Sequence, residues 1–292
     1  MPRVLIVGAG LVGALLAHEL GTRGWQVLLV ERRSDPRARG AVAGRSINLA
    51  ISVRGFDALD RAGLGDRLRE RAIRMPGRMI HPRTGAPFFQ PYSRDPTRAI
   101  HSVSRSRLNM LLLEAAAAQP SVEIRFDRRA LEVDFTRPAV SFLHEPTQAQ
   151  ERIEADMVIG ADGAYSAIRA AMQRNERFDY QQSFLTHGYK ELTIPALAED
   201  ADAHAVAPHA PFAMEPQALH IWPRGGSMMI ALPNPEGSFT CTLFWPFQGD
   251  HSFEALEGAL ADRRRAAAPN DPLPQPTDAE RQAVVGFFSR HY

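Results

Sequence analysis

The sequence predicts a mixed α/β (α+β) fold, in which a parallel sheet with a Rossmann-like start is accompanied by an antiparallel sheet. Two observations predict it. Residues 1–31 follow the order strand, glycine-rich turn, helix and strand. From His187 onward, short apolar or alternating runs are separated by proline and glycine, which is typical of antiparallel strands.

The N-terminal segment carries the strongest local pattern. Val4–Val7 is a β-branched and aliphatic run that indicates a strand buried on both faces. The turn Gly8-Ala9-Gly10-Leu11-Val12-Gly13 follows, and apolar residues then recur at helical spacing from Ala14 to Arg23. A second apolar run, Trp25 to Val30, ends on Glu31. This order matches the dinucleotide-binding fingerprint; the alternative is a tight strand–helix turn in another kind of α/β protein.

Each glycine of the turn has a physical role in that reading. Gly8 allows a tight turn out of the strand, and Gly10, without a Cβ, lets a pyrophosphate approach the backbone. Gly13 lets the helix pack closely on the sheet. The helix N-terminus offers free N–H groups and a positive dipole end to phosphates.

The acid at the end of the second strand indicates which dinucleotide is bound. Glu31 is placed to accept hydrogen bonds from a ribose diol, which favours an unphosphorylated ribose, as in FAD or NAD. Arg32 and Arg33 leave the alternative open, because arginine at this place can bind a 2′-phosphate.

Composition sets the limits. The 292 residues are 45% hydrophobic with a formal net charge of +1, enough for one or two domains, with no charge excess that would indicate nucleic acid. The single cysteine, Cys241, lies in an apolar run and is expected to be a small buried hydrophobe. Its isolation fits a reducing compartment, and no apolar run is long enough to span a membrane, so we expect a cytoplasmic protein without a membrane partner.

Between residues 34 and 118 the pattern alternates loops with short elements. Ser34–Gly44 is polar and reads as a loop, whereas Val53–Arg71 has a helical pattern. Short strands are expected at Arg78–His81, Phe88–Phe89 and Ile100–Val103. Ser104–Ala118 is a strong helix with Ser104 as its N-cap.

A second strand–glycine–helix junction follows three expected strands, Val122–Phe126, Leu131–Phe135 and Ala139–Leu143. Asp156–Ile159 reads as a buried strand that runs into Gly160-Ala161-Asp162-Gly163, and Ser166–Gln173 reads as a helix. This junction is either a ligand-binding turn at the carboxyl edge of the sheet or an ordinary strand-to-helix turn.

The remaining chain predicts the antiparallel sheet and two helices. The strands are expected at His187–Ile194, Leu219–Trp222, Met228–Leu232 and Phe239–Phe244, and the helices at Phe253–Arg265 and from Ala279 to the end. His204 and His209 lie in a loop without an acid or cysteine at ligand spacing, so we expect no metal site.

Several stretches together carry a family resemblance. They are the GxGxxG turn, Arg105 at a helix start, the GADG turn, and the strings 44–50 (GRSINLA), 90–92 (QPY), 187–192 (HGYKEL), 219–224 (LHIWPR), 230–234 (IALPN) and 238–247 (SFTCTLFWPF). On these residues the chain resembles the FAD-dependent aromatic hydroxylases of the para-hydroxybenzoate hydroxylase type, and within them the kynurenine 3-monooxygenases. The resemblance covers the chain up to about Phe247.

The resemblance implies a set of site residues. Positions that line FAD match Val12, Val30, Glu31, Arg32, Arg33, Ala50, Arg105 and Ala130, beside Gly8, Gly10, Gly13 and Asp162 from the two glycine turns. Arg78 and Tyr92 match the pair that holds the substrate carboxylate, a surface arginine and a packed aromatic being the alternative. Leu219, Ile230 and Leu232 match the apolar wall of the substrate pocket, with plain sheet core as the alternative.

The resemblance also implies a function and a domain plan. The family hydroxylates L-kynurenine to 3-hydroxykynurenine with NADPH and dioxygen; the flavin performs the chemistry, and NADPH binds only transiently. The domains are expected at 1–74 with 99–177 for FAD, at 75–98 with 178–258 for substrate, and at 259–292 as a helical tail. A homodimer is an open possibility. The alternatives are a non-catalytic dinucleotide-binding module and an NAD-dependent dehydrogenase.

The chain departs from the family at its C-terminus. The family continues with a second flavin motif and further substrate-binding residues that these 292 residues do not contain. We therefore expect a truncated chain, which on its own does not hydroxylate kynurenine at a useful rate.

Overall fold

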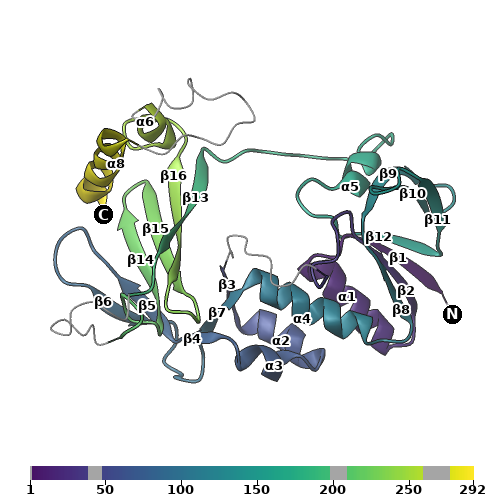
Figure 1. The fold of residues 1–292 in the computed structure, drawn as a ribbon, viewed down its shortest axis with the longest axis horizontal. Coiled ribbons are helices and arrows are strands. Elements are labelled where there is room, and N and C mark those ends of the chain that lie inside the picture. The colour runs from purple at the N-terminus through teal and green to yellow at the C-terminus, as the bar shows by residue number, and fades with distance from the viewer. Residues whose placement is uncertain (1, 39–47, 198–208, 259–276) are drawn as a thin grey trace. The chain divides into compact units, whose positions relative to one another are not determined.

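The computed structural model describes residues 2–38, 48–197, 209–258 and 277–292 (Figure 1). Contacts divide the chain into two units. The first unit comprises Met1–Ile47, Gly55–Glu70 and Ser104–Gln182, and the second comprises Asn48–Arg54, Arg71–Val103 and Ser183–Tyr292. The short strands at 48–51 and 100–104 thus group mainly with the second unit, whereas the domain plan from sequence assigns them to the FAD part.

The first unit is built on a four-stranded parallel sheet in the order β12-β1-β2-β8. Its strands are β1 (Arg3–Val7), β2 (Gln26–Val30), β8 (Val122–Arg125) and β12 (Met157–Gly160). Val4 to Val7 and Val27 to Val30 are all buried, as expected for strands covered on both faces. The expected strand at 156–159 exists but is not buried, because β12 is the edge strand and Met157 is 49% exposed.

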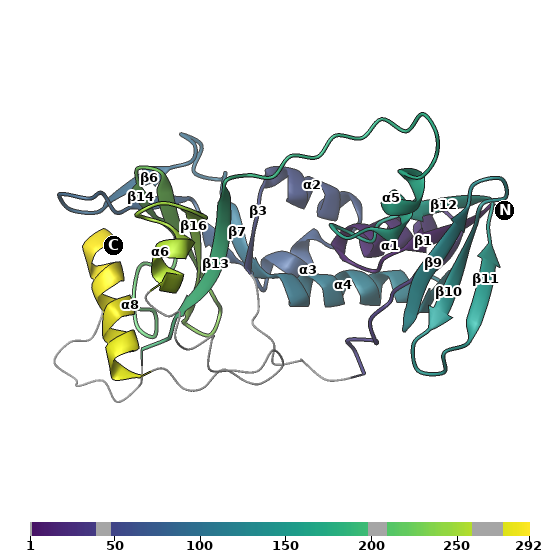
Figure 2. The ribbon, with the colours of Figure 1, turned by 90° about the horizontal axis from the view of Figure 1, so that it is seen from above.

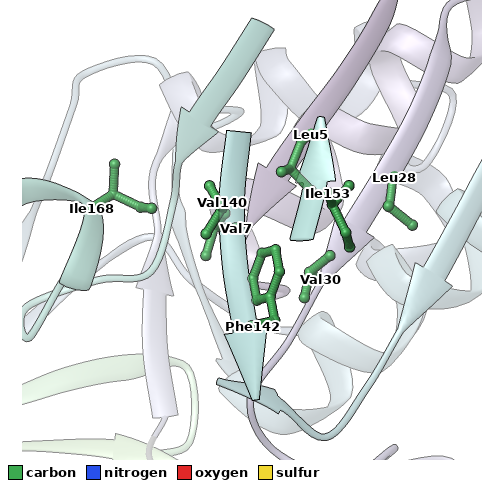
Figure 3. Packing of buried hydrophobic residues seen from close by; sticks show 8 residues of the cluster. All are labelled: Leu5, Val7, Leu28, Val30, Val140, Phe142, Ile153 and Ile168. Carbon is green, nitrogen blue, oxygen red and sulfur yellow. The ribbon is translucent and has the colours of Figure 1, made fainter. Parts of the chain in front are cut away.

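Helices cover one face of this sheet and a small antiparallel sheet covers the other. The helices α1 (Leu11–Thr22) and α4 (Arg105–Ala117) pack against each other, and α1 also contacts β1 and β2. The antiparallel sheet has the order β11-β10-β9, with β9 (Arg128–Asp134), β10 (Ala139–His144) and β11 (Gln150–Glu154). Figure 3 shows the core between the two sheets, in which Leu5, Val7, Leu28 and Val30 meet Val140, Phe142, Ile153 and Ile168.

The three strands expected over 122–143 fall into two sheets. β8 joins the parallel sheet beside β2, whereas β9 and β10 pair with each other. The sequence did not indicate β11, because Gln-Glu-Arg-Ile-Glu is almost wholly polar and only Ile153 faces the core. The helix α5 (Ala167–Met172) follows β12 as expected.

The expected helix over 53–71 is two helices. α2 (Val53–Arg61) and α3 (Gly65–Arg69) are separated by Gly63, whose φ of +70° a right-handed helix cannot contain.

The second unit is built on a six-stranded sheet in the order β13-β16-β15-β14-β5-β6. The strands are β5 (Gly77–Ile80), β6 (Phe88–Pro91), β13 (His187–Ile194), β14 (Ala218–Arg224), β15 (Ser227–Pro233) and β16 (Phe239–Pro246). Neighbouring strands are antiparallel except for the parallel pair of β5 and β14. A separate small sheet, β3-β7-β4, is formed by β3 (Asn48–Ile51), β4 (Ile73–Met75) and β7 (Ile100–Ser104).

One face of the six-stranded sheet is covered by the C-terminal helices. α6 (Phe253–Gly258) and α8 (Asp278–His291) lie beside β14 and β16 in both views (Figures 1 and 2). Trp245 stacks on Phe288, and its indole N–H donates to the Tyr292 hydroxyl at 2.8 Å. Cys241 is buried on this face, as expected, and burial raises the pKa of its thiol to about 11.

Several expectations fall outside the described residues, namely residues 39–44 of the expected loop, residues 44–47 of the string GRSINLA, His204, and the part of the helix at 253–265 that follows Gly258. Within the described residues, no helix is both long and apolar enough to cross a membrane, and no group of three or more metal-ligating side chains is found.

Candidate functional site

The turn after β1 has the geometry expected of a phosphate-binding loop. Gly8 has a φ of +105°, and a Cβ there would lie 2.5 Å from the Ala161 carbonyl oxygen. A Cβ on Gly13 would lie 1.9 Å from the Gly8 oxygen, so α1 approaches the turn as closely as only glycine permits. In front of Gly10, by contrast, no described heavy atom lies within 4 Å of the place a Cβ would take. The tight turn at Gly8 and the close packing at Gly13 are thus as predicted, and the backbone at Gly10 is open.

The N-terminus of α1 faces this open space with unsatisfied donors. Gly10 is the N-cap and has no side chain to accept from the first turn, and its own carbonyl accepts from Ala14 N. No acidic residue lies in the first turn, and Val12 is 71% exposed. The first N–H groups of a helix lack intrahelical partners and carry the positive end of its dipole, so this end is suited to bind a diphosphate.

Glu31 is held in place by donors from the glycine turn and from the residues that follow β2. Its Oε2 accepts from Ala9 N at 2.9 Å, and its Oε1 accepts from the N–H and Nε–H of Arg33 at 3.0 and 2.9 Å. Burial alone would raise the pKa of Glu31, but the hydrogen bonds from Arg33 and Ala9 hold that pKa below its ordinary value. The carboxylate is therefore ionised and available to a ribose diol.

This geometry also bears on the two arginines. Both arginines are exposed, and Arg33 is engaged with Glu31 through its backbone N–H and its Nε–H. An arginine neutralised by the neighbouring acid is a poor receptor for a 2′-phosphate. The site therefore favours a dinucleotide with an unphosphorylated ribose.

The other predicted cofactor residues have different surroundings. Val30 is fully buried in the sheet core, and its carbonyl accepts from Gly8 N, so it supports the turn from behind. Ala130 lies on β9 and packs against the core between the sheets. Arg105 is exposed at the first residue of α4. Ala50 is exposed on β3, in the second unit.

Asp162, in the second glycine turn, has a structural partner already. Its carboxylate accepts from Ser166 Oγ at 2.5 Å and from the N–H groups of Ala167 and Ile168 at 2.6 and 3.3 Å. These bonds cap α5, which is the ordinary strand-to-helix reading of the turn. The backbone of this turn still contributes to the site, because Ala161 packs directly behind Gly8.

The predicted substrate residues lie together on one face of the six-stranded sheet. The register places Arg78 beside Leu219, and pairs Ile221 with Ile230. Because side chains alternate along a strand, Arg78, Leu219, Ile230 and Leu232 point to the same face, opposite the one that α8 covers. Leu232 is buried and the other three are half-buried.

Arg78 and Tyr92 form the polar end of this face. The Arg78 guanidinium lies over the Tyr92 ring, 5.2 Å from its centroid, and Tyr92 N donates to the Pro76 carbonyl at 3.0 Å. Burial raises the pKa of Tyr92, partly opposed by the Arg78 charge, so its hydroxyl remains a donor at neutral pH. Arg78 Nε is buried and has no hydrogen-bond partner among the described residues. The planar guanidinium of Arg78, whose Nε–H has no partner among the described residues, is suited to bind a carboxylate.

Sequence reasoning missed two contacts that bear on these sites. Asn109 of α4 donates through Nδ2 to the Ala9 carbonyl at 3.3 Å. The signal was a polar residue beside the buried leucines of α4, which alone does not reveal a partner 100 positions away. On the covered face of the six-stranded sheet, His81 Nε2 lies 2.8 Å from Nδ1 of the buried His220.

A comparison with protein families agrees with the dinucleotide site. The profile of the FAD binding domain family matches residues 1–235. The chain therefore belongs to the FAD-binding domain family, and FAD, with its diphosphate and unphosphorylated ribose, fits the open turn at Gly10 and the carboxylate of Glu31.

Individual relatives are similar over almost the whole chain. A kynurenine 3-monooxygenase of Stenotrophomonas maltophilia is 47% identical over 270 residues, which cover 92% of this chain and 57% of that protein. One of Myxococcus xanthus is 49% identical over 255 residues, which cover 87% of this chain and 53% of that protein. The chain thus spans little more than half the length of these relatives.

Solved structures share the fold. The p-nitrophenol 4-monooxygenase of Pseudomonas putida superposes with a TM-score of 0.65 at 18% identity, over 94% of this chain and 65% of that one. The tetrameric form of 2-methyl-3-hydroxypyridine-5-carboxylic acid oxygenase gives 0.67 at 18% identity, over 99% and 65%. The predicted fold, a Rossmann-like FAD part together with an antiparallel sheet, as in the para-hydroxybenzoate hydroxylase type, is confirmed.

Proposed function

We propose that this chain supplies the FAD site and part of the substrate site of a monooxygenase that hydroxylates L-kynurenine to 3-hydroxykynurenine, using NADPH and dioxygen. The identity of nearly half its residues with kynurenine 3-monooxygenases supports the substrate class.

The observation that carries the proposal is the arrangement on the face of the six-stranded sheet opposite the one that α8 covers. L-Kynurenine has an α-amino acid carboxylate at one end and an apolar aromatic ring at the other. Arg78 and Tyr92 place a cation and a hydroxyl donor at one point, and Leu219, Ile230 and Leu232 continue the same face as an apolar surface. This pattern matches a ligand whose carboxylate binds at Arg78 and Tyr92 and whose aryl ring lies along the apolar surface.

The roles of the residues follow from that arrangement. Arg78 and Tyr92 bind and orient the carboxylate, and the apolar residues hold the ring and exclude water from it. FAD, held at the turn from Gly8 to Gly13 and at Glu31, would supply the redox chemistry of a hydroxylation that consumes NADPH and dioxygen and releases water. The sequence has no second GxGxxG turn, so NADPH is proposed as a transient co-substrate.

Two further properties, the cellular compartment and the oligomeric state, complete the proposal. The lone cysteine is buried and unpaired, which is compatible with the reducing cytoplasm. A homodimer remains a prediction, which sedimentation of the purified chain tests directly.

The test of the function is the consumption of NADPH by the FAD-loaded chain in air. L-Kynurenine is expected to raise the rate several-fold. Kynuramine, which lacks only the carboxylate, is expected to leave the rate at its basal value. A rate that neither compound changes overturns the proposal in favour of a dinucleotide-binding module without this activity. An equal response to both overturns the role of Arg78 and Tyr92.

A further inference from the structure

The two peptide groups that flank Ala9, in the middle of the phosphate-binding turn, are each held by a side chain. The Ala9 N–H donates to Glu31 Oε2 at 2.9 Å, and the Ala9 carbonyl accepts from Asn109 Nδ2 at 3.3 Å. Ala9 itself is buried, with 3% of its surface exposed. Glu31, directly after β2, therefore orients the Gly8–Ala9 peptide, and Asn109 of α4 orients the Ala9–Gly10 peptide.

The orientation of that peptide decides where the next backbone donor points. Within the described residues, Gly8 N donates to Val30 O at 2.7 Å and Gly10 O accepts from Ala14 N at 2.9 Å. No described acceptor takes the Gly10 N–H. Because Ala9 C=O and Gly10 N–H belong to the same planar peptide unit, fixing the carbonyl also fixes the direction of that N–H.

We propose that Asn109 is a positioning residue of the FAD site: its side-chain amide holds the Ala9 carbonyl and so keeps the Gly10 N–H directed into the open space where the diphosphate binds. The inference rests on the FAD site and is independent of which substrate is hydroxylated. Asn109 does not bind FAD itself; it acts through the Ala9–Gly10 peptide.

The alternative is that Asn109 only joins α4 to the rest of the first unit. The two roles differ in what a substitution changes. A purely structural amide affects stability, whereas a positioning amide also affects FAD affinity and the mobility of the turn when FAD is absent.

The experiment compares Asn109→Leu and Asn109→Asp with the parent chain. Gln119→Leu serves as the matched control, because it removes another side-chain amide of the same unit, one that lies 3.5 Å from the His18 ring. For Asn109→Leu we expect the dissociation constant for FAD to rise about five- to thirtyfold. We also expect faster hydrogen exchange in peptides that cover residues 8–13 of the FAD-free chain. For Gln119→Leu we expect neither.

Asn109→Asp tests the positioning role through the pH dependence of FAD affinity, which a purely structural amide would not change. An ionised carboxylate repels the Ala9 carbonyl, whereas the protonated acid can donate to it. FAD affinity of this variant is therefore expected to recover as the pH falls from about 7 to about 4.5, relative to the parent at each pH. The proposal is overturned if Asn109→Leu leaves both FAD affinity and the exchange of residues 8–13 unchanged, or if Asn109→Asp shows no relative recovery. Loss of kynurenine-stimulated NADPH consumption alone bears on the proposed function and not on Asn109.

Discussion

The guanidinium of Arg78 lies over the ring of Tyr92, with 5.2 Å between its central carbon and the ring centroid. The two residues come from neighbouring segments of the sheet, since Arg78 pairs with Gln90 and Tyr92 N bonds to Pro76 O. A cation held against an aromatic face keeps its edge donors free for an anion in the plane of the guanidinium. This pair is the basis of the first prediction.

Arg78→Ala is expected to weaken L-kynurenine binding while sparing FAD. Losing a charge-assisted, partly buried hydrogen bond should cost about 1.5–3 kcal/mol, or roughly tenfold to a hundredfold in affinity. Arg78→Lys should recover only part of this, because an ammonium cannot bind a carboxylate through a planar fork. Calorimetric titration measures both. Unchanged kynurenine affinity in Arg78→Ala would contradict the assignment.

Gly10→Val is expected to abolish FAD binding without unfolding the chain. The backbone at Gly10 has an ordinary φ of −72°, and a Cβ meets no described atom within 4 Å, so the valine occupies only the space left for the diphosphate. Gly13→Val is the contrasting variant, because its Cβ would lie 1.9 Å from the Gly8 oxygen and should disrupt the unit itself. Circular dichroism and flavin fluorescence after gel filtration separate the two outcomes. Flavin retained by Gly10→Val would show the account of this turn to be wrong.

Asp162→Ala is expected to act chiefly on stability. The Asp162 carboxylate caps α5 through two backbone N–H groups, and loss of such a cap costs about 0.5–2 kcal/mol. For a chain of this size that corresponds to a lower melting temperature by roughly 1–3 °C. Thermal unfolding of the FAD-free chain checks this. An unchanged melting temperature together with lost FAD affinity would instead return Asp162 to the cofactor.

The pair of His81 and His220 should make the chain sensitive to acid. His220 Nε2 faces the Glu215 carbonyl at 2.8 Å and so carries the proton, which leaves Nδ1 to accept from His81 Nε2. Burial, with the neighbouring His220 and Arg224, lowers the pKa of His81 from 6.5 to about 4.

The sign follows from proton linkage. As the pH falls, the unfolded chain binds a proton at His81 before the folded chain does. The free energy of unfolding that this neutral pair contributes is therefore present above about pH 6.5 and is lost as the pH falls toward about 4. His81→Asn is expected to flatten this part of the curve of melting temperature against pH. A curve that runs parallel to that of the parent chain would contradict the role of the pair.

The parts of the fold that the sequence predicted well are those with local causes. The turn from Gly8 to Gly13 requires glycine for steric reasons that the pattern alone contains. Ser104 was expected to cap α4, and its Oγ accepts from Arg107 N. The features that could not be predicted depend on distant partners. β11 is polar and is held by pairing with β10, and Asn109 of α4 donates to the Ala9 carbonyl in the turn before α1.

The substrate face shows the same limit. Without the family resemblance, the sequence favours a surface arginine for Arg78 and a packed loop aromatic for Tyr92. The proximity of Arg78 to Tyr92 depends on the pairing of β5 with β6. The proximity of Arg78 to Leu219 depends on the pairing of β5 with β14, which lies about 140 positions further along the chain. Local patterning contains no information on such a register.

The most direct test of the central claim is a calorimetric titration of the FAD-loaded chain with L-kynurenine and, separately, with kynuramine. If Arg78 and Tyr92 hold the carboxylate of an aromatic amino acid against the apolar face, kynurenine binds at one site per chain and kynuramine binds at least about tenfold more weakly. Equal affinities for the two compounds, or no binding of kynurenine, would contradict the account.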